Sequence, residues 1–410
     1  MSILDVSLDW KLLLSCLPED YEELAVTHKQ LQTQYGNAKI TTAEQLLRLF
    51  FVHVGAELPL RQTVVLIAAA GGPKLAPMRL HMKMRRAVPY LHALVERMCV
   101  DREDASPELW SGYDLCALDG STVCGPGATG TDARLHANIR LSNLRILEAQ
   151  VTDPTVGETF KNFSFEPGQL ALADRGYSNA PGIAWVREHQ ADVLVRLNRG
   201  ALPLFDPEDG QTLDVLAWVR SLPDDTAVER AVFINNKDAT APRCQRIEGR
   251  LVATRLPPKQ TQEARARVQR EQGSDASSDT IEMAGYVVLF TTTPSSRLSA
   301  SRCLAAYRLR WQVELLFKRW KSLGGMDELP NQRDDTTLAW LYVKLLLGLI
   351  VERLGSAAAS AATELSPPVR LLQHDRPARL HRATTRAAAL EGRQPALARG
   401  RCSRASPVAR

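Results

Sequence analysis

The sequence predicts an α/β fold behind a helical N-terminal region, and three observations indicate this. Residues 1–110 contain successive runs with the spacing of short amphipathic helices. Two nearly continuous apolar runs, 113–119 and 170–174, each end in an aspartate followed by a glycine turn, as is typical of strands buried on both faces. Residues 307–321 then have the period of an amphipathic helix. With 410 residues, 45% of them hydrophobic, the chain can bury one large or two medium cores.

The N-terminal region contains three recognisable helices. A capping-box pattern at residues 41–44 predicts a helix that closes near Gly55. Further helices are expected over 60–70 and 77–99, and Pro89 marks a kink or a boundary in the last of them. This third helix carries a basic group consisting of Arg79, Lys83, Arg85 and Arg86. Such a series fits a DNA-binding module, and a helical cap with a solvated basic face is the alternative.

Strands are expected to follow the helical region. Runs at 113–119, 135–141 and 145–152 predict an antiparallel meander that precedes a helical crossover. Asp119 and Asp174 are each placed where a strand ends, and catalytic groups in open α/β sheets gather at such positions. For either aspartate alone, a simple turn-forming role is at least as good an interpretation.

The interval between Asp174 and Glu314 is far longer than a single crossover connection needs. Strand-like runs occur within it at 192–197, 230–234 and 285–292, and a charged helical pattern occurs at 259–272. Together with many prolines, these runs predict a mainly β insertion at about 193–295. Within the insertion, Trp218 is expected to pack in a core, with stacking on a DNA base as the less favoured alternative.

Residues 307–321 present two different faces. At about 100° per residue, one arc of roughly 60° collects Tyr307, Arg310, Glu314 and Lys321. Apolar side chains gather on a neighbouring arc, so one face packs into a core while the other presents a carboxylate flanked by a phenol, a guanidinium and an ammonium group. Such a group suits a metal ion and a phosphate together. The alternative is a solvated helix in which Arg310 and Glu314 form an ordinary i,i+4 pair.

The last part of the chain differs in composition from the rest. An apolar helix is expected over 338–354, and its most apolar run, 341–351, is too short to span a bilayer. Residues 355–410 hold ten Arg and no Lys against three acidic residues, a local charge of +7, and no aromatic residue. They are predicted to be disordered or to be an out-of-frame end. Residues 1–354 carry a charge of −2, so DNA binding there needs clustered bases.

Cysteine content and the first residues bear on the compartment. The seven cysteines form no C-x-x-C pair, and their odd number argues against a disulfide framework. The chain begins with acidic residues where a signal peptide carries basic ones. We therefore expect a soluble, intracellular protein that makes no contact with membranes.

Two aspartates from strands and one glutamate from a helix form the strongest candidate site. Asp119, Asp174 and Glu314 offer the oxygen ligands that hard cations such as Mg²⁺ prefer. Two such ions about 4 Å apart can stabilise both the attacking and the leaving oxygen of a phosphoryl displacement. The three carboxylates together indicate this chemistry more strongly than any one of them does.

On these residues the sequence resembles the DDE transposases of bacterial insertion sequences, and most closely insertion-sequence family four. That group has the signature Tyr-x2-Arg-x3-Glu-x6-Lys, which is matched at every position by Tyr307, Arg310, Glu314 and Lys321. Residues 118–120 match the first aspartate motif of the family, and residues 174–177 match the second. The likeness extends from about residue 40 to about residue 354.

The resemblance implies an RNase H-like catalytic core at 111–354, interrupted by the β-rich insertion, and an N-terminal DNA-binding domain at 1–110. It also implies metal ligands, namely Asp119, Asp174 and Glu314, which would hold two Mg²⁺ ions with Mn²⁺ as a substitute. The phosphates of the transposon end would be gripped by Tyr307, Arg310 and Lys321.

The implied activity is binding of double-stranded DNA at the terminal inverted repeats of an insertion sequence, followed by cleavage and by transfer of the 3′ ends to target DNA. The resemblance further implies a homodimer on DNA, in the bacterial cytoplasm at the nucleoid. One alternative is a remnant, defective in catalysis or assembly, that binds element ends as a repressor. A general RNase H-like nuclease without specificity for element ends is less favoured, because the spacing of the residues from Tyr307 to Lys321 would then have no function.

Overall fold

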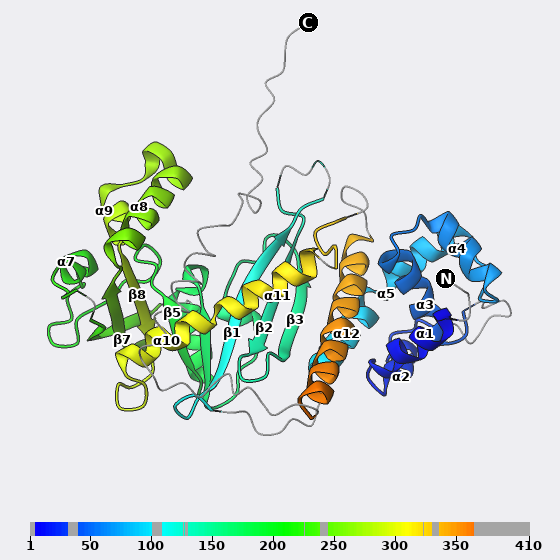
Figure 1. Ribbon diagram of the computed structural model, residues 1–410, viewed down its shortest axis with the longest axis horizontal. Coiled ribbons are helices and arrows are strands. Elements are labelled where there is room, and N and C mark those ends of the chain that lie inside the picture. Colours follow the sequence, from blue (N-terminus) through cyan, green and yellow to red (C-terminus); the bar gives the residue numbers. More distant parts are fainter. Residues whose placement is uncertain are drawn as a thin grey trace, which may run out of the picture. The chain divides into compact units, whose positions relative to one another are not determined.

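The computed structural model confirms the mixed α/β fold, which is built on one eight-stranded sheet in the part of the chain that is described (Figure 1). The described residues are 5–364, with interruptions at 32–39, 101–108, 126, 128–129, 225, 238–244, 323 and 330–335. The described residues up to Ile350 belong to one compact unit, and the described residues from Val351 belong to a second.

The N-terminal part is helical, as predicted. Its helices are α1 (Asp5–Ser15), α2 (Tyr21–Thr27), α3 (Ala43–Gly55), α4 (Leu60–Ala69) and α5 (Pro77–Val100). Helix α5 does not end at Pro89, so a boundary at this proline is wrong. Tyr90 and Leu91, which follow the proline, are fully buried, and Tyr90 Oη donates to the carbonyl of Tyr21 at 3.1 Å. This burial offsets the backbone hydrogen bond that proline cannot make.

The cap of α3 lies one residue later than the sequence pattern predicts. The Thr42 hydroxyl accepts from the backbone N–H of Gln45 at 3.2 Å, and the Gln45 side chain accepts from the backbone N–H of Thr41 at 2.9 Å. The expected pair of Thr41 with Glu44 is therefore wrong. Glu44 instead accepts from the indole N–H of Trp10 at 2.9 Å, a contact across the helical region that no local pattern reveals.

The central sheet has the strand order β3-β2-β1-β4-β5-β8-β7-β6. Its strands are β1 (Asp114–Val123), β2 (Ala133–Arg140), β3 (Ile146–Thr152), β4 (Gln169–Ala173), β5 (Asp192–Arg196), β6 (Val228–Asn236), β7 (Gln245–Arg255) and β8 (Tyr286–Thr291). Strands β1 to β3 form the predicted antiparallel meander, whereas β4 is parallel to β1 and β5 is parallel to β4. The remaining pairs are antiparallel.

The strands of the β-rich segment continue this same sheet. Strand β8 pairs with β5, with Leu194 opposite Thr291, and β7 and β6 follow outward. Strand β7 was not expected from the sequence, because Arg246, Glu248 and Arg250 interrupt its apolar pattern. Trp218 packs against the buried core, as expected.

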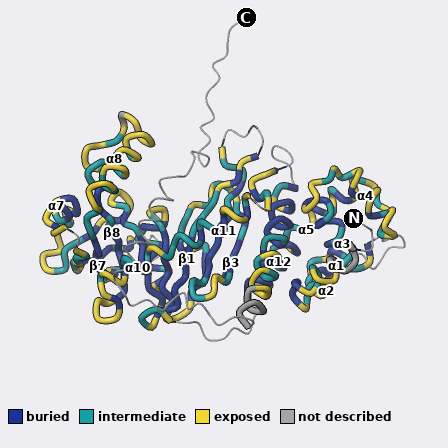
Figure 2. Tube along the Cα trace, viewed as in Figure 1, coloured by how far each residue is buried: buried dark blue, intermediate teal, exposed yellow. Residues whose placement is uncertain are grey.

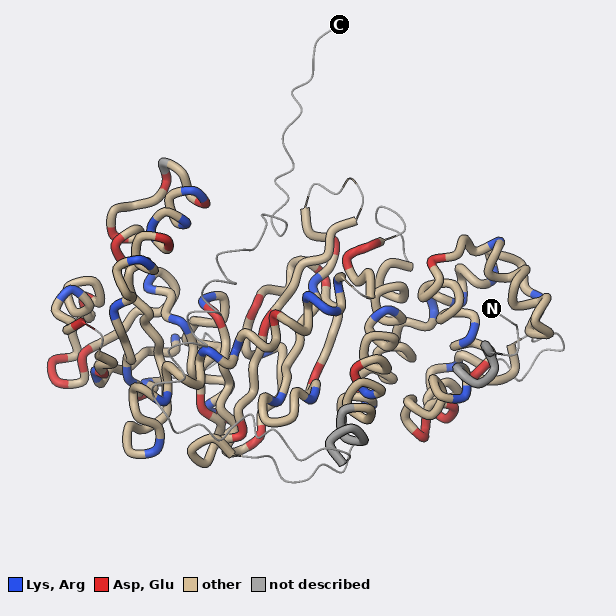
Figure 3. The backbone as a smooth tube through the Cα atoms, viewed as in Figure 1, with Lys and Arg blue, Asp and Glu red and all other residues tan. Residues whose placement is uncertain are grey.

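The helices of the middle of the chain are α6 (Ala180–Glu188), α7 (Val215–Arg220), α8 (Pro258–Gln272) and α9 (Ser278–Met283). Short 3₁₀ turns lie at η1 (Phe160–Asn162), η2 (Arg175–Tyr177) and η3 (Gly273–Asp275). Helix α8 has no buried residue and is coloured mostly as exposed in Figure 2. Charges of both signs follow one another along it (Figure 3).

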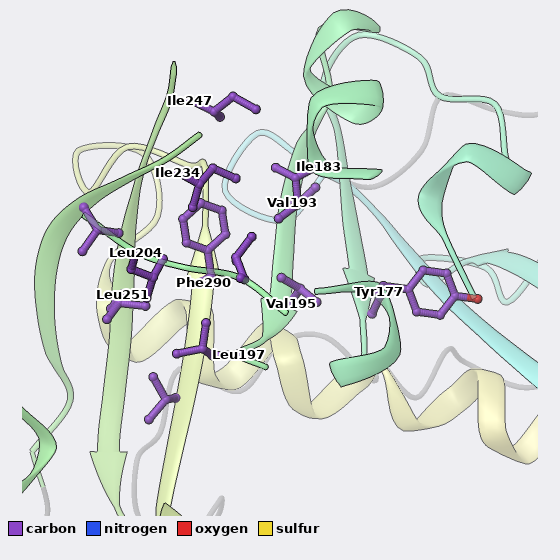
Figure 4. Close-up of a cluster of buried hydrophobic side chains, with 14 of the residues drawn as sticks. Tyr177, Ile183, Val193, Val195, Leu197, Leu204, Ile234, Ile247, Leu251 and Phe290 are labelled. Carbon is purple, nitrogen blue, oxygen red and sulfur yellow. The ribbon is translucent and has the colours of Figure 1, made fainter. Parts of the chain in front are cut away.

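Side-chain alternation gives the sheet two separate cores. Leu118, Ala171 and Val193 face the core shared with α6 and α7, part of which is drawn in Figure 4. Their sequence neighbours Leu170 and Leu194 face the other core, which includes residues of α10 (Ala300–Leu309). Successive residues of a strand point to opposite faces, so each central strand is buried on both sides, as its continuous apolar character predicts.

The signature segment forms two helices that meet at Arg310, and not the single predicted helix. Helix α10 ends at Leu309 and α11 (Trp311–Ser322) begins after Arg310. At the junction the backbone N–H of Arg310 bonds to the carbonyl of Tyr307, and that of Val313 bonds to the carbonyl of Arg310. These i→i+3 bonds tighten the turn locally.

The apolar helix α12 (Thr337–Glu364) extends beyond its predicted end at Leu354. The beginning of the predicted tail is therefore helical, and the remainder, 365–410, lies outside the described residues. Before Val351, the helix contacts the sheet through Tyr342 Oη, which donates to the carbonyl of Val151 at 3.2 Å. None of the helices described is long and apolar enough to cross a membrane.

Arg250 of β7 joins the sheet to the start of α10. Its side chain is almost fully buried and donates to the carbonyls of Thr293 and Leu298 and to the carboxylate of Glu229. We predict that Arg250→Met lowers the free energy of unfolding by roughly 3 kcal/mol or more, because these acceptors lose a buried charged partner. Urea denaturation followed by circular dichroism measures this change.

The matched control for this substitution is Arg267→Met on α8. Arg267 is 68% exposed and forms an i,i+4 pair with Glu271 at 3.0 Å. Its loss is expected to cost about 0.5 kcal/mol or less. Equal losses for the two variants would contradict a structural role for the buried Arg250.

Candidate active site

Asp119 lies inside β1 and not at its end, so this part of the prediction is wrong. The antiparallel pairing of β1 with β2 continues to Val123, whereas the parallel pairing with β4 stops at Ala117, opposite Leu172. Asp119 therefore follows the point where β1 separates from β4. In α/β sheets, ligands usually bind where two neighbouring parallel strands separate at their carboxyl ends.

Asp174 directly follows β4, as predicted. Its side chain caps the 3₁₀ turn η2, with Oδ1 accepting from the backbone N–H of Gly176 at 2.8 Å. Continuing the β1–β4 register by two residues brings Asp174 opposite Asp119. By strand alternation the side chain of Asp119 points to the same face as Leu115, which is the face covered by α10.

Helix α11 packs on β1 and β2 and brings Glu314 to this face of the sheet. Arg310, at the junction of the two helices, donates a hydrogen bond to Glu314 Oε1. Its other terminal nitrogen lies 3.8 Å from Asp119 Oδ2. One guanidinium thus joins the carboxylate of a helix to the carboxylate of a strand, so the i,i+4 pair considered from the sequence is only one of its contacts.

Burial is the main reason that the pKa of Asp119 rises to about 7. The guanidinium of Arg310 lowers this pKa, while the negative charges of Asp174 and Glu314 raise it further. The carboxylate of Asp119 is 15% exposed, so water screens these neighbours only in part. The pKa of Asp119 therefore stays raised although Arg310 lies beside it.

The donor set fits a hard divalent cation, because it consists of carboxylate oxygens around a buried acid that lacks sufficient positive charge. In the described part of the chain, however, no three Asp, Glu, His or Cys side chains lie close enough together to hold one ion. The guanidinium of Arg310 lies between two of the expected ligands.

The two remaining signature residues are Lys321, which contacts β1, and Tyr307, which lies beside Arg310. Lys321 Nζ donates to the carbonyl of Thr122 in β1 at 2.8 Å, and burial lowers the pKa of Lys321. The Arg310 guanidinium lies 5.8 Å from the centre of the Tyr307 ring. Arg310 thus contacts Asp119, Glu314 and Tyr307, whereas Asp174 acts on Asp119 through its charge and Lys321 lies further along β1.

Two residues near the site were not selected from the sequence. Glu158, in the connection between β3 and β4, lies against both Gly120 and Gly176. Tyr177 is fully buried and has a hydroxyl with no hydrogen-bond partner among the described residues. Tyr177 belongs to the second aspartate motif, but nothing in the local sequence of Glu158 marks it. The sequence offered one signal for a close neighbour, namely that a glycine follows each aspartate, Gly120 after Asp119 and Gly176 after Asp174.

Comparison with known proteins agrees with this geometry. The family described as Transposase DDE domain matches residues 110–349, which is more than half of the chain. The chain belongs to the DDE transposases, a family of enzymes that generally use divalent metal ions, and it is a transposase of the insertion-sequence type.

Its relatives come from mobile elements of bacteria. The putative transposase InsL for insertion sequence element IS186A of Escherichia coli strain K12 is 28% identical over 351 residues, which cover 84% of this chain and 93% of the relative. The transposase for insertion sequence element IS421 of Escherichia coli has the same identity and coverage over 352 residues. The transposase for insertion sequence element IS231D of Bacillus thuringiensis subsp. finitimus is 24% identical over 225 residues, covering 52% and 46% of the two chains.

The raised pKa of Asp119 predicts how stability depends on pH without metal. An unfolded aspartate ionises near pH 4, so the folded protein binds one more proton between about pH 4 and pH 7 and loses stability as the pH rises through this window. Asp119→Asn cannot ionise. At pH 8 it should exceed the wild type in free energy of unfolding by about 1–4 kcal/mol.

Urea denaturation in EDTA at pH 8 and pH 4.5 measures this difference. The advantage of Asp119→Asn should shrink at the lower pH, where folded Asp119 is already protonated. A difference that stays the same at both pH values would contradict a raised pKa for Asp119.

Proposed function

We propose that this transposase binds the terminal inverted repeats of its insertion sequence and catalyses Mg²⁺-dependent DNA cleavage and strand transfer. The observation that carries the proposal is the cluster in which Arg310 joins Asp119 to Glu314, beside Asp174. The three carboxylates come from β1, from the turn after β4 and from α11, and the residues expected to bind DNA phosphates adjoin them.

Asp119, Asp174 and Glu314 would hold two Mg²⁺ ions, with Mn²⁺ as a substitute. When bound, such ions activate the attacking oxygen and neutralise the charge that develops on the leaving oxygen. The chain itself must supply an ionised Asp119, and Asp119 loses its proton only near pH 7 in the metal-free protein. The surrounding negative charge that raises this pKa is the same charge that favours a divalent cation.

The phosphates of the transposon end would be bound by Tyr307, Arg310 and Lys321. Arg310 presents a planar guanidinium that suits phosphate as well as carboxylate. A DNA phosphate that draws Arg310 away from Asp119 and Glu314 would free both carboxylates for metal. End binding and metal binding would in this way support each other.

The larger organisation that we propose follows from the same resemblance. The order of the first five strands in the sheet supports an RNase H-like core at 111–354, interrupted by the β-rich segment 193–295. Exposed bases on α5, including Arg79 and Arg86, support a DNA-binding role for residues 1–110, although Lys83 donates to the carbonyl of Gln30. We further propose that two copies act on two element ends at the nucleoid.

Cleavage of a labelled duplex that carries the element's terminal repeat tests the catalytic assignment. Glu314→Ala is expected to reduce the rate of cleavage in Mg²⁺ by roughly 10³-fold or more, because one of the carboxylate ligands is lost. Ca²⁺ in place of Mg²⁺ should support binding without cleavage. Glu263→Ala on the exposed helix α8 is the matched control and should cleave at the rate of the wild type.

The outcomes of this experiment separate the candidate functions. Cuts at the repeat boundary that require Glu314 would support the proposal. Cuts at equal rates in unrelated duplexes would point to a general nuclease. Binding of the repeat without any cleavage by the wild type would point to a remnant that acts as a repressor.

Lys321 is expected to contribute to binding of the end more than to chemistry. Lys321→Ala should weaken binding and reduce the slope of log affinity against log salt by about one phosphate contact. Gel-shift titrations over a range of salt concentrations measure the slope. Lys318→Ala, at an exposed lysine on the same helix, is the control, and an equal change of slope would mean that Lys321 acts only through general charge.

A further inference from the structure

Glu158 occupies the space that two glycines leave beside the candidate metal ligands. A Cβ atom on Gly120 would lie 3.0 Å from Glu158 Cγ and 3.1 Å from Glu158 Oε1. A Cβ atom on Gly176 would collide with Glu158 Oε2 and would lie 3.1 Å from Asp174 Oδ1. The same Cβ position at Gly176 adjoins an oxygen of Glu158 and an oxygen of Asp174, so the two carboxyl groups lie close to each other.

The carboxylate of Glu158 has one ion pair, with Arg134, at the same 3.8 Å that separates Arg310 from Asp119. Arg134 Nη1 lies 3.8 Å from Glu158 Oε1, which is beyond hydrogen-bond distance, while Arg134 Nε donates to the carbonyl of Pro154 at 3.2 Å. The side chain of Glu158 is only 27% exposed. Burial raises the pKa of Glu158, as does the charge of Asp174, and Arg134 only partly opposes them.

The hydroxyl of Tyr177 is a second and independent feature of the same place. The ring packs against Phe160 and Phe163, with centroids 5.2 and 6.5 Å apart. Figure 4 shows the hydroxyl oxygen pointing away from the other labelled side chains of the core. It is buried and has no partner among the described residues, and a buried hydroxyl of this kind costs free energy unless it is hydrogen-bonded.

The surroundings of this hydroxyl are acidic. Besides burial, the negative charges of Asp119, Glu158 and Asp174 all raise the pKa of Tyr177. The phenol therefore approaches the carboxylates from the face of the sheet opposite to α11, because Tyr177 packs in the same core as Leu118. The Tyr177 hydroxyl is buried without a partner among the described residues, so it can donate to a water molecule in these acidic surroundings.

We propose, resting on the proposed function, that Glu158 is a fourth carboxylate of the metal centre. It would act as a positioning residue that, with the Tyr177 hydroxyl, bonds to a water molecule of a divalent cation held by Asp174. Mg²⁺ keeps several of its waters in protein sites, and carboxylates that accept hydrogen bonds from such ligands orient them. Gly120 and Gly176 are then needed because any side chain there would displace Glu158.

Binding of Mn²⁺ to the full chain without DNA tests this role. Free Mn²⁺ is measured by electron paramagnetic resonance during titration of the wild type, Glu158→Gln and Tyr177→Phe. Each substitution is expected to weaken binding roughly 10- to 100-fold, as is usual for residues that orient metal ligands. Glu166→Gln, at an exposed glutamate in the same connection, is the matched control and should bind like the wild type.

Stability without metal separates positioning from a structural role. Tyr177→Phe removes a hydroxyl that has no protein partner, so its midpoint of thermal unfolding in EDTA should equal or exceed that of the wild type. A structural hydroxyl would lower this midpoint. The double variant should bind Mn²⁺ little more weakly than either single variant, because both act through one water.

Asp119→Asn distinguishes failure of this inference from failure of the proposed function. Loss of Mn²⁺ binding in Asp119→Asn, with affinities of Glu158→Gln and Tyr177→Phe within about twofold of the wild type, would overturn the role of Glu158 alone. Mn²⁺ binding that is unchanged in Asp119→Asn would overturn the proposed metal centre, and the role of Glu158 with it.

Discussion

The contacts of Arg310 with Asp119 and Glu314 are the interaction on which the arrangement of the site depends. They join the junction of α10 and α11 to the middle of β1. Asp119 is buried beside two further carboxylates, and without a cation nearby its ionised form would be strongly disfavoured. The guanidinium offsets part of the negative charge around Asp119.

The position of the site follows from the way in which β1 has two different partners. Its pairing with β4 ends at Ala117, but its pairing with β2 continues to Val123. The sheet opens at Asp119, and the turn after β4 places Asp174 at the same level. Helix α11 covers this opening on one face of the sheet. Tyr177 lies in the core on the other face, and Glu158 packs against Gly120 and Gly176. Residues from both faces can therefore serve one centre.

Much of the fold could be predicted, because its central strands and its helices have regular apolar patterns. The errors fall where tertiary contacts override local signals. Burial carries α5 through Pro89, and β2 holds β1 in an extended conformation beyond Asp119. Strand β7 was missed because Arg250, a charged residue in its middle, is buried by contacts with the segment before α10. No pattern within β7 contains that information.

The sequence by itself determined the class of the protein, since the spacing of Tyr307, Arg310, Glu314 and Lys321 and the two aspartate motifs are properties of the linear chain. It also determined which carboxylates to consider. Only the tertiary structure decided that Arg310 lies between Asp119 and Glu314, and that Glu158 adjoins Asp174. Such contacts join residues that are distant in sequence or that point to different faces. Their geometry depends on sheet register and packing, which no local periodicity encodes.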